Sequence, residues 1–437
     1  MALVVQKYGG SSVADASSIK RVAHRIVGAR QDGADVVVAV SAMGDTTDTL
    51  MELANQVTPV PGGRELDMLL TAGERISMAL LAMAVNDLGF EARSFTGSQA
   101  GIITDSVHGL AHIIDVTPGR IRTALDEGAV VIVAGFQGVS RATKDITTLG
   151  RGGSDTTAVA LAAALGADVC EIYTDVDGVF TADPRIVPTA RRLATISYAE
   201  MLEMAACGTR VLHLRSVEYA RRHGIPIHVR SSFSDRPGTI VSSAPTRPAR
   251  NHTRPTDTER GAFAVEEPII SGVSHDRSEA KITLVGVPDV VGRAAGVFSA
   301  VAAVAVNIDM IVQNAPVGPS GVADISFTLP TADLARAVRA LDAERGALGF
   351  TSLVVDDQIG KVSLIGAGMR SSPGVSATFF GALAGAGINI GMISTSEIRI
   401  SVVVPSGDVD AAVIALHTAF GLDADAPEAV VYAGTGR

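Results

Sequence analysis

An internal repeat in the second half of the chain limits most strongly how that half can fold. Residues 292–311 (GRAAGVFSAVAAVAVNIDMI) align with residues 374–393 (GVSATFFGALAGAGINIGMI) at a constant offset of 82 residues. Apolar positions recur at helical spacing in both copies. These positions are Phe298, Val301, Ala302 and Ala305 in the first copy, and Phe380, Leu383, Ala384 and Gly387 in the second. Each copy therefore predicts one amphipathic helix, and the repeat predicts two similar domains.

The segments around each copy match as well. The matching pairs are 281–286 with 361–366, 324–328 with 397–401, and 331–345 with 407–420. The first two pairs have the apolar patterns of strands, and the third has helical spacing. With a closing strand, each unit has the order strand, helix, strand, strand, helix, strand, which is a ferredoxin-like βαββαβ plan.

The first half repeats a different theme, in which a short apolar run is followed by a turn of small or polar residues and then by a helical stretch. The runs are 3–5, 36–40, 130–134 and 171–173. They do not alternate between apolar and polar residues, which is typical of parallel strands covered on both faces. The chain is therefore predicted to be α/β, with a mainly parallel sheet flanked by helices and followed by two ferredoxin-like domains.

A change in composition marks the boundary between the two halves. The stretch SAPTRPARNHTRPTDTERG contains three prolines and almost no apolar residues, which indicates a linker. We predict a first domain at 1–243, a linker at 244–262, and two ferredoxin-like domains at 263–347 and 348–437.

Charge and apolar length exclude several classes of function. The 36 Lys and Arg residues against 46 Asp and Glu give a net charge of −10 without a basic cluster, which argues against a nucleic-acid surface. The longest apolar run, 294–306, is too short to cross a bilayer. The first residues lack the pattern of a signal peptide, so we expect a cytoplasmic protein. The two cysteines have no metal-ligand spacing, and no metal-ligating residues are predicted.

Two glycine-rich turns are candidates for anion binding. Residues 7–12 (KYGGSS) place a lysine before two glycines, and residues 150–157 (GRGGSDTT) place an arginine among three. Backbone N–H groups, a helix start and a cationic side chain can together hold a phosphate or a carboxylate. A structural interpretation stays open for both turns, because Ser12 or Asp15 and Ser154 or Asp155 can cap the helix that follows.

Two further polar stretches are candidates for ligand binding. Residues 71–77 (TAGERIS) begin a predicted helix, where Glu74 can act as a cap or receive a substrate ammonium group. Residues 174–185 (TDVDGVFTADPR) follow a predicted strand with three acidic residues and one arginine. Turn propensity explains Asp177 and Gly178 but does not explain Asp183 and Arg185.

Taken together, these stretches resemble the aspartate kinases of the amino acid kinase family. The motifs KYGGSSV, SAMGDTTD, TAGERIS, GFQGV, TLGRGGSDTTA and YTDVDGVFTADPR occur in the family's order. The repeated second half resembles the tandem ACT domains of that family, so the resemblance covers nearly the whole chain. Residues 217–234 and the ending AVVYAGTGR are similar to the actinobacterial type that lysine and threonine regulate.

The resemblance implies transfer of the ATP γ-phosphoryl group to the β-carboxylate of L-aspartate, with Mg²⁺ as cofactor. The product, 4-phospho-L-aspartate, would be the first intermediate on the way to lysine, threonine and methionine. A carboxylate is already an anion at neutral pH, so no catalytic base is needed and the site mainly has to stabilise negative charge. This agrees with the lack of a recognisable Ser/His/Asp catalytic triad in the sequence.

The resemblance also implies a role for individual residues. The implied catalytic residues are Lys7, Arg151 and Asp155. The implied aspartate-binding residues are Ser41, Thr47, Glu74, Arg151, Gly152, Gly153 and Ser154, with Glu74 on the α-ammonium group and Arg151 on the α-carboxylate. The implied nucleotide-binding residues are Lys7, Tyr8, Gly9, Gly10, Ser11, Thr174, Asp175, Phe180, Asp183, Arg185, Thr209 and Arg210. At Arg210 the chain departs from the family, which often has a lysine there.

Allosteric control by lysine, threonine or both is a further implication. The implied effector-binding residues are Asp289, Asn307, Ile308, Gln313, Asn389 and Ile390. Residues 288–292 (PDVVG) lack the Pro-Gly pair that related enzymes have after the first ACT strand, and two prolines stand in the loop after Gln313. We therefore predict that the regulatory architecture is retained and that the sensitivity is altered. We also expect a homodimer through the ACT domains or a complex with a regulatory-only subunit.

Three alternatives stay open at the level of sequence. The chain can be another amino acid kinase, or an aspartate kinase that accepts an aspartate analogue in a specialised pathway. It can also be an amino-acid-sensing subunit without activity, although intact Lys7, Glu74, Arg151 and Asp155 argue against that interpretation.

Overall fold

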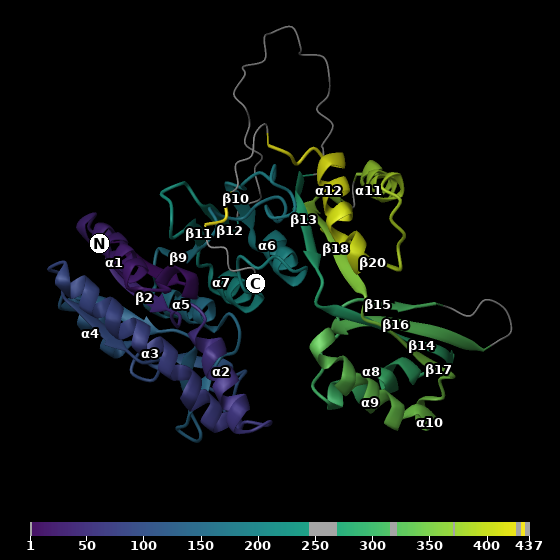
Figure 1. Ribbon diagram of the computed structural model, residues 1–437, viewed down its shortest axis with the longest axis horizontal. Coiled ribbons are helices and arrows are strands. Elements are labelled where there is room, and N and C mark those ends of the chain that lie inside the picture. Colours follow the sequence, from purple (N-terminus) through teal and green to yellow (C-terminus); the bar gives the residue numbers. More distant parts are fainter. Residues whose placement is uncertain (1, 244–268, 315–320, 370–371, 425–429, 433–437) are drawn as a thin grey trace, which may run out of the picture.

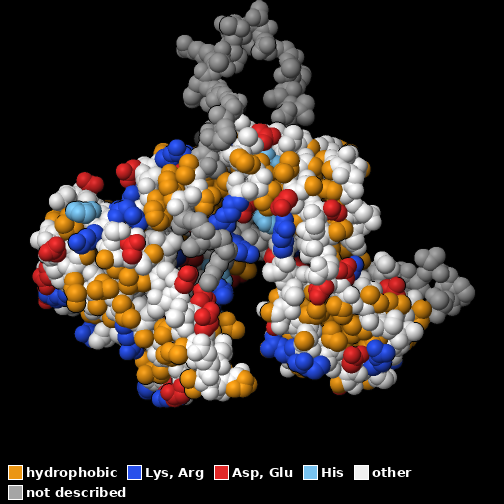
Figure 2. All heavy atoms as spheres, in the orientation of Figure 1, with side chains coloured by type: hydrophobic (Ala, Val, Ile, Leu, Met, Phe, Trp, Pro, Cys, Tyr) orange, Lys and Arg blue, Asp and Glu red, His pale blue; other side chains and the backbone are white. Residues whose placement is uncertain are grey.

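A computed structural model describes residues 2–243, 269–314, 321–369, 372–424 and 430–432. Figure 1 shows a larger first half and two smaller sheets that follow it in the chain. The predicted linker lies outside the described residues, so the boundaries of the linker and of the first domain stay predictions. On the face shown in Figure 2, acidic and basic side chains are interspersed.

The first half is built on an eight-stranded sheet with the order β10-β12-β11-β9-β1-β2-β6-β3. Its strands are β1 Leu3–Tyr8, β2 Asp35–Val40, β3 Ala92–Phe95, β6 Val130–Ala134, β9 Val169–Thr174, β10 Thr195–Ser197, β11 Ile227–Ser231 and β12 Thr239–Ser242. Every neighbouring pair is parallel except β11 with β12. The four predicted apolar runs correspond to β1, β2, β6 and β9, which confirms the α/β prediction.

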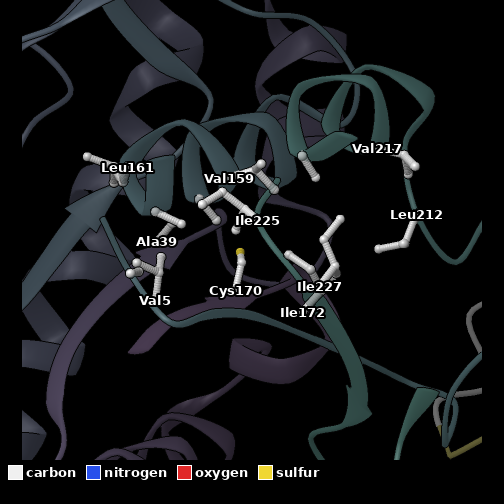
Figure 3. Close-up of a cluster of buried hydrophobic side chains, with 14 of the residues drawn as sticks. Val5, Ala39, Val159, Leu161, Cys170, Ile172, Leu212, Val217, Ile225 and Ile227 are labelled. Carbon is white, nitrogen blue, oxygen red and sulfur yellow. The ribbon is translucent and has the colours of Figure 1, made fainter. Parts of the chain in front are cut away.

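Helices cover both faces of this sheet. The helices of the first half are α1 Ala16–Gln31, α2 Thr46–Val57, α3 Gly63–Asp87, α4 Gly119–Asp126, α5 Gly153–Leu165, α6 Tyr198–Ala206 and α7 Leu214–His223, of which α2 packs on α3. Val37 and Ala39 of β2 pack in the cluster with α5, which Figure 3 shows around Val159 and Cys170. The alternate residues Val36, Val38 and Val40 pack with α1 and α3 on the opposite face. Because both faces are buried, the strand needs apolar residues at every position.

A second, four-stranded sheet extends the first half, with the order β5-β4-β7-β8. Its strands are β4 Ile102–Thr104, β5 Ile113–Val116, β7 Gln137–Ser140 and β8 Ile146–Thr148. The chain leaves β8 and enters the loop that begins α5, so this sheet supports the second glycine-rich turn.

The helix α3 is long and apolar enough to span a membrane by length and composition alone. Half of its most apolar window is buried inside the protein, and buried Asp67 and Glu74 lie on its inner face. A core helix passes the same test, so α3 carries no argument for a membrane.

The second half contains two ferredoxin-like units. The first unit has the sheet order β15-β16-β14-β17. Its elements are β14 Glu279–Pro288, α8 Arg293–Ala303, β15 Ile311–Gln313, β16 Val322–Pro330, α9 Leu334–Ala343, α10 Arg345–Leu348 and β17 Ser352–Asp356. The second unit has the order β13-β18-β20-β19. Its elements are β13 Ile269–Asp276, β18 Ile359–Ala367, α11 Gly374–Gly385, β19 Met392–Thr395, β20 Arg399–Pro405 and α12 Val409–Ala419.

The predicted boundary between the two units is wrong. The strand β17 falls in the predicted range 348–437 but pairs with β14 of the first unit. The strand β13 falls in the predicted range 263–347 but pairs with β18 of the second unit. The described residues contain no strand of this sheet after α12, so β13 fills the edge beside β18. The first unit is therefore inserted between two strands of the second.

The buried faces of the repeated helices also differ from the prediction. Val297 and Val301 are the buried residues of α8, and the equivalent Phe379 and Leu383 are buried in α11. Ala305 is exposed because α8 ends at Ala303 and Ala305 itself has a left-handed backbone with φ of 53°. The helices and the buried positions Val301 and Leu383 were predicted correctly, whereas Val297 and Phe379 are buried in place of the predicted Phe298 and Phe380, which are half-buried.

The second unit packs directly on the first half. The loop between β9 and β10 contributes Val176, Phe180 and Val187 to a buried cluster that contains Val362 and Leu416 of the second unit. Polar contacts reinforce this interface, since Ser271 Oγ donates to Glu200 Oε1 at 2.5 Å and Arg399 pairs with Glu203 at 3.1 Å. The loop after β9 is thus in direct contact with the second unit.

Candidate functional site

The strand order brings the predicted motifs to one edge of the large sheet. The strands β9, β1, β2 and β6 are parallel neighbours, so their carboxyl ends meet at the same edge. Each strand runs directly into one of the predicted polar turns. Lys7 and Gly9 stand at the end of β1, Ser41 follows β2, Gly135 follows β6, and Thr174 ends β9.

An ion pair joins the two glycine-rich turns. Lys7 Nζ lies 2.7 Å from Asp155 Oδ1, which is in the first turn of α5. The two atoms meet by charge and not as an aligned hydrogen bond, because Oδ1 has no hydrogen-bond partner among the described residues. The side chains are 14% and 10% exposed, so the pair is partly accessible although Oδ1 itself is buried. An anionic ligand can therefore compete for Lys7.

Glycines allow these turns to approach each other closely. A Cβ on Gly10 would lie 2.9 Å from the carbonyl oxygen of Gly44, in the turn after β2. A Cβ on Gly135 would lie 2.7 Å from Ser154 Oγ at the start of α5. Gly152, the residue before α5, has a left-handed φ of 71° that favours glycine. Turns packed in this way leave main-chain N–H groups as donors for a phosphate.

Glu74 is a buried carboxylate at the same edge. Its Oε1 accepts a hydrogen bond from the Ala42 N–H at 3.3 Å, and its Oε2 has no partner among the described residues. Burial raises the pKa of Glu74 to about 7. Ser77, one turn later in α3, donates from Oγ to the carbonyl oxygen of Ser41 at 2.7 Å. A buried carboxylate with a free oxygen is well suited to receive a cation.

The capping interpretation of Glu74 is wrong. The sequence predicted that a helix begins at residues 71–77, but α3 already begins at Gly63. Glu74 therefore lies in the middle of a 25-residue helix, where no N-terminal amides are free. Its position favours the other interpretation, in which it receives a substrate ammonium group.

The remaining predicted aspartate-binding residues lie in the turns at this edge. Gly153 and Ser154 form the start of α5, and Thr47 is in the first turn of α2, directly after the turn that contains Ser41. Arg151 is exposed in the loop between β8 and α5, and its guanidinium makes no ion pair within the described chain. An arginine in this state is available for a carboxylate ligand.

Four of the predicted nucleotide-binding residues lie together in the loop after β9. Thr174 Oγ1 donates to Asp175 Oδ1 at 3.0 Å, and Arg185 lies 3.6 Å from the other oxygen of Asp175. The main-chain N–H of Arg185 donates to Asp183 Oδ1 at 2.9 Å. The two residues that turn propensity did not explain, Asp183 and Arg185, thus make polar contacts within this loop.

Two aromatic residues of the predicted nucleotide site are packing residues. Tyr8 is 0% exposed, stacks on Tyr173 with ring centroids 4.6 Å apart and donates to Gln6. Its side chain is therefore excluded from contact with a nucleotide, so only the main chain of Tyr8 is left to contribute to the predicted nucleotide site, and the assignment of Tyr8 stays a prediction. Phe180 is 5% exposed and packs in the cluster that joins the loop to the second unit. The sequence did not suggest this packing role.

Thr209 and Arg210 are separated in their contacts from the other candidates. Thr209 Oγ1 is hydrogen-bonded to Ser274 Oγ of β13 at 2.8 Å. A Cβ on Gly208, which has a left-handed φ of 103°, would lie 2.1 Å from the carbonyl oxygen of His275. Arg210 is exposed. This segment therefore packs on the second ferredoxin-like unit, and the structure does not bring it into contact with the glycine-rich turns.

The predicted effector-binding residues lie on both ferredoxin-like units. Asp289, Asn307, Gln313 and Asn389 are exposed, and Ile308 and Ile390 are half-buried. Asn389 lines a cavity of about 180 Å³ together with Lys281 and Asp356 of the first unit and Val403 of the second. The prolines predicted to alter the loop after Gln313 lie outside the described residues. The effector assignments stay predictions.

Sequence reasoning missed Asp67, which supports the loop of Arg151. Asp67 is buried and accepts hydrogen bonds from Thr148 Oγ1 at 2.5 Å and from the Gly109 N–H at 3.1 Å. His108 Nδ1 lies 2.7 Å from its other oxygen. Thr148 ends β8, three residues before Arg151. The sequence contains a pattern that could have identified Asp67, because the seven-residue spacing from Asp67 to Glu74 places both residues on one face of a helix.

A divalent metal at this site would have to arrive with the nucleotide. The described residues contain no group of three or more His, Cys, Asp or Glu side chains that could hold a metal ion. Mg²⁺ is usually bound through phosphates and one or two carboxylates, and it needs no such group. Asp155, a carboxylate beside the glycine-rich turns, fits this kind of site.

Comparisons with known proteins point to one family. The model of the amino acid kinase family matches residues 2–231, and the model of the ACT domain matches residues 282–344 and 362–420. The aspartokinase of Mycobacterium tuberculosis is 65% identical over 437 residues, which cover 100% of both chains. The aspartokinase of Corynebacterium glutamicum is 58% identical over the same length, also with 100% of both chains covered.

A solved structure agrees with these relatives. The crystal structure of Escherichia coli aspartokinase III in complex with aspartate and ADP, called the R-state, is 26% identical and gives a TM-score of 0.80. The similarity covers 96% of this chain and 100% of that chain. The structure of the same protein with lysine and aspartate, called the T-state, gives a TM-score of 0.69 over 95% of this chain and 99% of that chain.

Proposed function

The chain belongs to the aspartokinases of the amino acid kinase family, which are phosphotransferases, and we propose that it transfers the γ-phosphoryl group of ATP to the β-carboxylate of L-aspartate. One observation carries this proposal. A solvent-reachable lysine and a buried carboxylate with a free oxygen lie at the same sheet edge, among turns packed too closely for side chains. Such an edge offers cationic and main-chain donors to a phosphate and an acceptor to an ammonium group.

Lys7 and the turn after β1 bind the phosphates in this proposal. The ammonium group of Lys7 leaves Asp155 or shares it when the more highly charged phosphates arrive, and the N–H groups of Gly9, Gly10 and Ser11 add neutral donors. Mg²⁺ bound with the nucleotide would neutralise part of the phosphate charge near Asp155. Thr174, Asp175 and Arg185 hold the loop on the nucleotide side.

Glu74 and Arg151 select the acceptor. The substrate ammonium group stabilises the ionised form of Glu74, which burial alone disfavours. Arg151 can form a bidentate pair with the α-carboxylate. With both α-groups bound, the β-carboxylate is the group left to face the phosphates, so an acceptor without a free α-amino group should bind poorly.

The reaction itself requires positioning and charge stabilisation. The β-carboxylate oxygen attacks the γ-phosphorus. The bond between the γ-phosphorus and the bridging oxygen breaks, and ADP leaves with that oxygen. No proton has to be removed from the acceptor, which agrees with a site that uses Lys7, Arg151 and main-chain donors. The product is an acyl phosphate, 4-phospho-L-aspartate, which would supply the pathways to lysine, threonine and methionine.

Regulation, assembly and location form a second part of the proposal. Two ACT units and the lysine complex of E. coli aspartokinase III support control by lysine, threonine or both. We expect the exposed effector candidates, such as Asn307 and Asn389, to bind the amino acid, with altered sensitivity. We also propose that the protein forms a homodimer through the ACT units or a complex with a regulatory-only subunit. Its proposed location is the cytoplasm.

A hydroxamate assay tests the proposed reaction. Purified protein is incubated with MgATP, L-aspartate and hydroxylamine, and the aspartyl hydroxamate is measured together with ADP. We expect hydroxamate and ADP in equal amounts with L-aspartate, and neither product with N-acetyl-L-aspartate or L-glutamate. Turnover of N-acetyl-L-aspartate at a similar rate would contradict the roles of Glu74 and Arg151, and a lack of turnover with L-aspartate would contradict the function.

A further inference from the structure

The end of the chain returns to the first half and contacts the loop after β9. The last helix, α12, belongs to the second ferredoxin-like unit and ends at Ala419. Residues 430–432, however, lie beside β11 and β12 of the first half, where Figure 1 shows them in yellow. Tyr432 contacts the segment 175–177, which includes the proposed nucleotide-binding residue Asp175, and it also contacts Phe233.

Main-chain contacts join the two segments. Val431 forms an antiparallel β-bridge with Val176. The N–H of Tyr432 donates to the carbonyl oxygen of Asp175 at 3.0 Å. A residue outside the first half therefore fixes the backbone of Asp175, whose carboxylate contacts Thr174 and Arg185.

The side chain of Tyr432 adds two further contacts. Its hydroxyl donates to Asp177 Oδ2 at 3.3 Å, and its ring stacks on Phe233 with centroids 5.9 Å apart. Arg21 covers the same Phe233 ring at 4.5 Å. Asp177 is 1% exposed and also accepts from Ser234 Oγ. The ring of Tyr432 is thus held by groups of the first half and not by its own unit.

A second set of contacts holds the other end of the loop. Asp423 accepts from Thr189 Oγ1 at 2.6 Å, and the N–H of Ala424 donates to the carbonyl oxygen of Thr189 at 2.7 Å. His417 Nε2 of α12 is hydrogen-bonded to Thr181 Oγ1 at 2.8 Å. The loop between β9 and β10 is therefore attached at two places to residues from α12 onwards.

We propose that Tyr432 is a positioning residue for the nucleotide site, acting through the backbone of Asp175 and the side chain of Asp177. The inference rests on the proposed function, since it concerns the nucleotide half of that site. Tyr432 holds Asp175 and Arg185 in the orientation that the nucleotide needs, and it makes nucleotide affinity dependent on the docking of the second ferredoxin-like unit. The aspartate half of the site, around Glu74, has no contact with Tyr432 and is unaffected.

The test compares Tyr432→Ala, Tyr432→Phe and Val430→Ala in the full chain. Val430, two residues earlier and 39% exposed, is the matched control. We expect Tyr432→Ala to raise the KM for MgATP and the Kd for MgADP by about fivefold to tenfold, as loss of the ring stacking on Phe233 and of the hydroxyl hydrogen bond would. The KM for aspartate should change less than twofold. Tyr432→Phe keeps the ring and the main-chain bond and should restore at least half of the lost affinity, and Val430→Ala should match the wild type.

Hydrogen exchange provides a readout that does not depend on activity. Amides in residues 175–193 should exchange faster in Tyr432→Ala, whereas those of α3 should not change. An equal rise of both KM values, or unchanged exchange and unchanged nucleotide affinity, would overturn the inference. Should Tyr432→Ala fail to fold, Tyr432→Leu carries the same expectation. A wild-type protein that binds no MgADP would refute the proposed function instead, and the exchange comparison would still test the contact.

Discussion

Two lysine–carboxylate clusters in this molecule have similar chemistry and opposite surroundings. In the first half, Lys7 and Asp155 are 14% and 10% exposed and lie among glycine-rich turns. Between the ferredoxin-like units, Lys361 of β18 is 1% exposed and pairs with Glu279 of β14 and, at 2.5 Å, with Asp309. Burial alone would lower the pKa of Lys361, but the two carboxylates outweigh burial and raise it above its ordinary value.

The two lysines differ in role: the charge of Lys7 is available to bind a ligand, whereas the charge of Lys361 stabilises the fold. Lys7 can exchange its partner for a ligand because its side chain is partly exposed and lies among glycine-rich turns. Lys361 has no such access, and its role is to fasten β18 of one unit to β14 of the other. Breaking a buried pair leaves a carboxylate without a partner, whereas breaking the open pair mainly removes a ligand contact. Substitutions at the two lysines should therefore affect different properties.

Lys7→Ala should have the largest effect on activity. Removal of a full charge from the phosphate site should lower kcat by about a thousandfold or more, because that charge is needed most when the phosphoryl group transfers. The free energy of unfolding should fall by less than in Lys361→Ala, since the Lys7–Asp155 pair is partly exposed, at 14% and 10% of the two side chains. The measurement is steady-state turnover of MgATP with L-aspartate, together with thermal unfolding. A variant with wild-type turnover would remove the distinction between the two lysines.

Lys361→Ala should have the largest effect on stability. It leaves Glu279 buried without its cation, which should destabilise the fold by about 3–5 kcal/mol. The folded fraction should keep a wild-type KM for both substrates when it is measured well below the unfolding temperature. Thermal unfolding of the variant and of the double substitution Lys361→Met with Glu279→Leu provides the check, because the double variant should recover most of the loss. Unchanged unfolding of Lys361→Ala would show that the cluster is not structural.

Glu74, in the first half, should make both the free energy of unfolding and the KM for aspartate depend on pH. The pKa of Glu74 is about 7 in the folded chain and 4.5 for the unperturbed group. Between these values the folded state holds a proton that the unfolded state has released, so the free energy of unfolding falls as the pH rises, by up to about 3 kcal/mol. The KM for aspartate should decrease over the same rise, because the ionised carboxylate receives the ammonium group.

Glu74→Gln tests both effects. The variant should raise the KM for aspartate by roughly 10-fold to 100-fold at pH 8, as expected for the loss of a charge-assisted hydrogen bond. It should also abolish the change of unfolding free energy between pH 5 and 7. Unfolding curves and aspartate titrations at a series of pH values give the measurement. A variant that keeps the wild-type pH profile would assign the titration to another group.

Lys281→Ala should have the smallest effect and provides the internal control. Lys281 occupies the position in β14 that Lys361 occupies in β18, but it is 21% exposed and lies 3.9 Å from Asp356. Exposed pairs of this kind contribute about 0.2–1 kcal/mol, so its unfolding temperature should be close to that of the wild type. A loss as large as that of Lys361→Ala would mean that the sequence repeat, and not burial, decides the role of the lysine.

Local patterns predicted much of this molecule. The core strands, the turns after them and the repeated helices follow from apolar runs, glycines and helical spacing within short segments. Lys7, Ser41 and Ser154 lie at one sheet edge because parallel strands end together. The adjoining Tyr8 was assigned to the nucleotide, although strand alternation turns its side chain away from that of Lys7 and into the core.

The remainder depends on contacts between distant segments. The exchange of β13 and β17 between the two sheets leaves no local trace, because both strands have ordinary apolar patterns. The position of Glu74 in the middle of α3 could not be predicted, because the helix begins at Gly63 without a side-chain cap at the residue before it. The contact between Tyr432 and Asp177 joins residues 255 positions apart, and only the packed fold brings them together.

The central claim is that one pocket brings the terminal phosphate of ATP to the side-chain carboxylate of an amino acid. The most direct measurement follows L-aspartate labelled with ¹³C at the β-carboxyl by ¹³C and ³¹P NMR during turnover of MgATP. We predict a new β-carboxyl signal coupled to phosphorus in the wild type and no such signal in Lys7→Ala. Phosphorus coupled to the α-carboxyl, or ATP hydrolysis without any phosphorylated aspartate, would contradict the account.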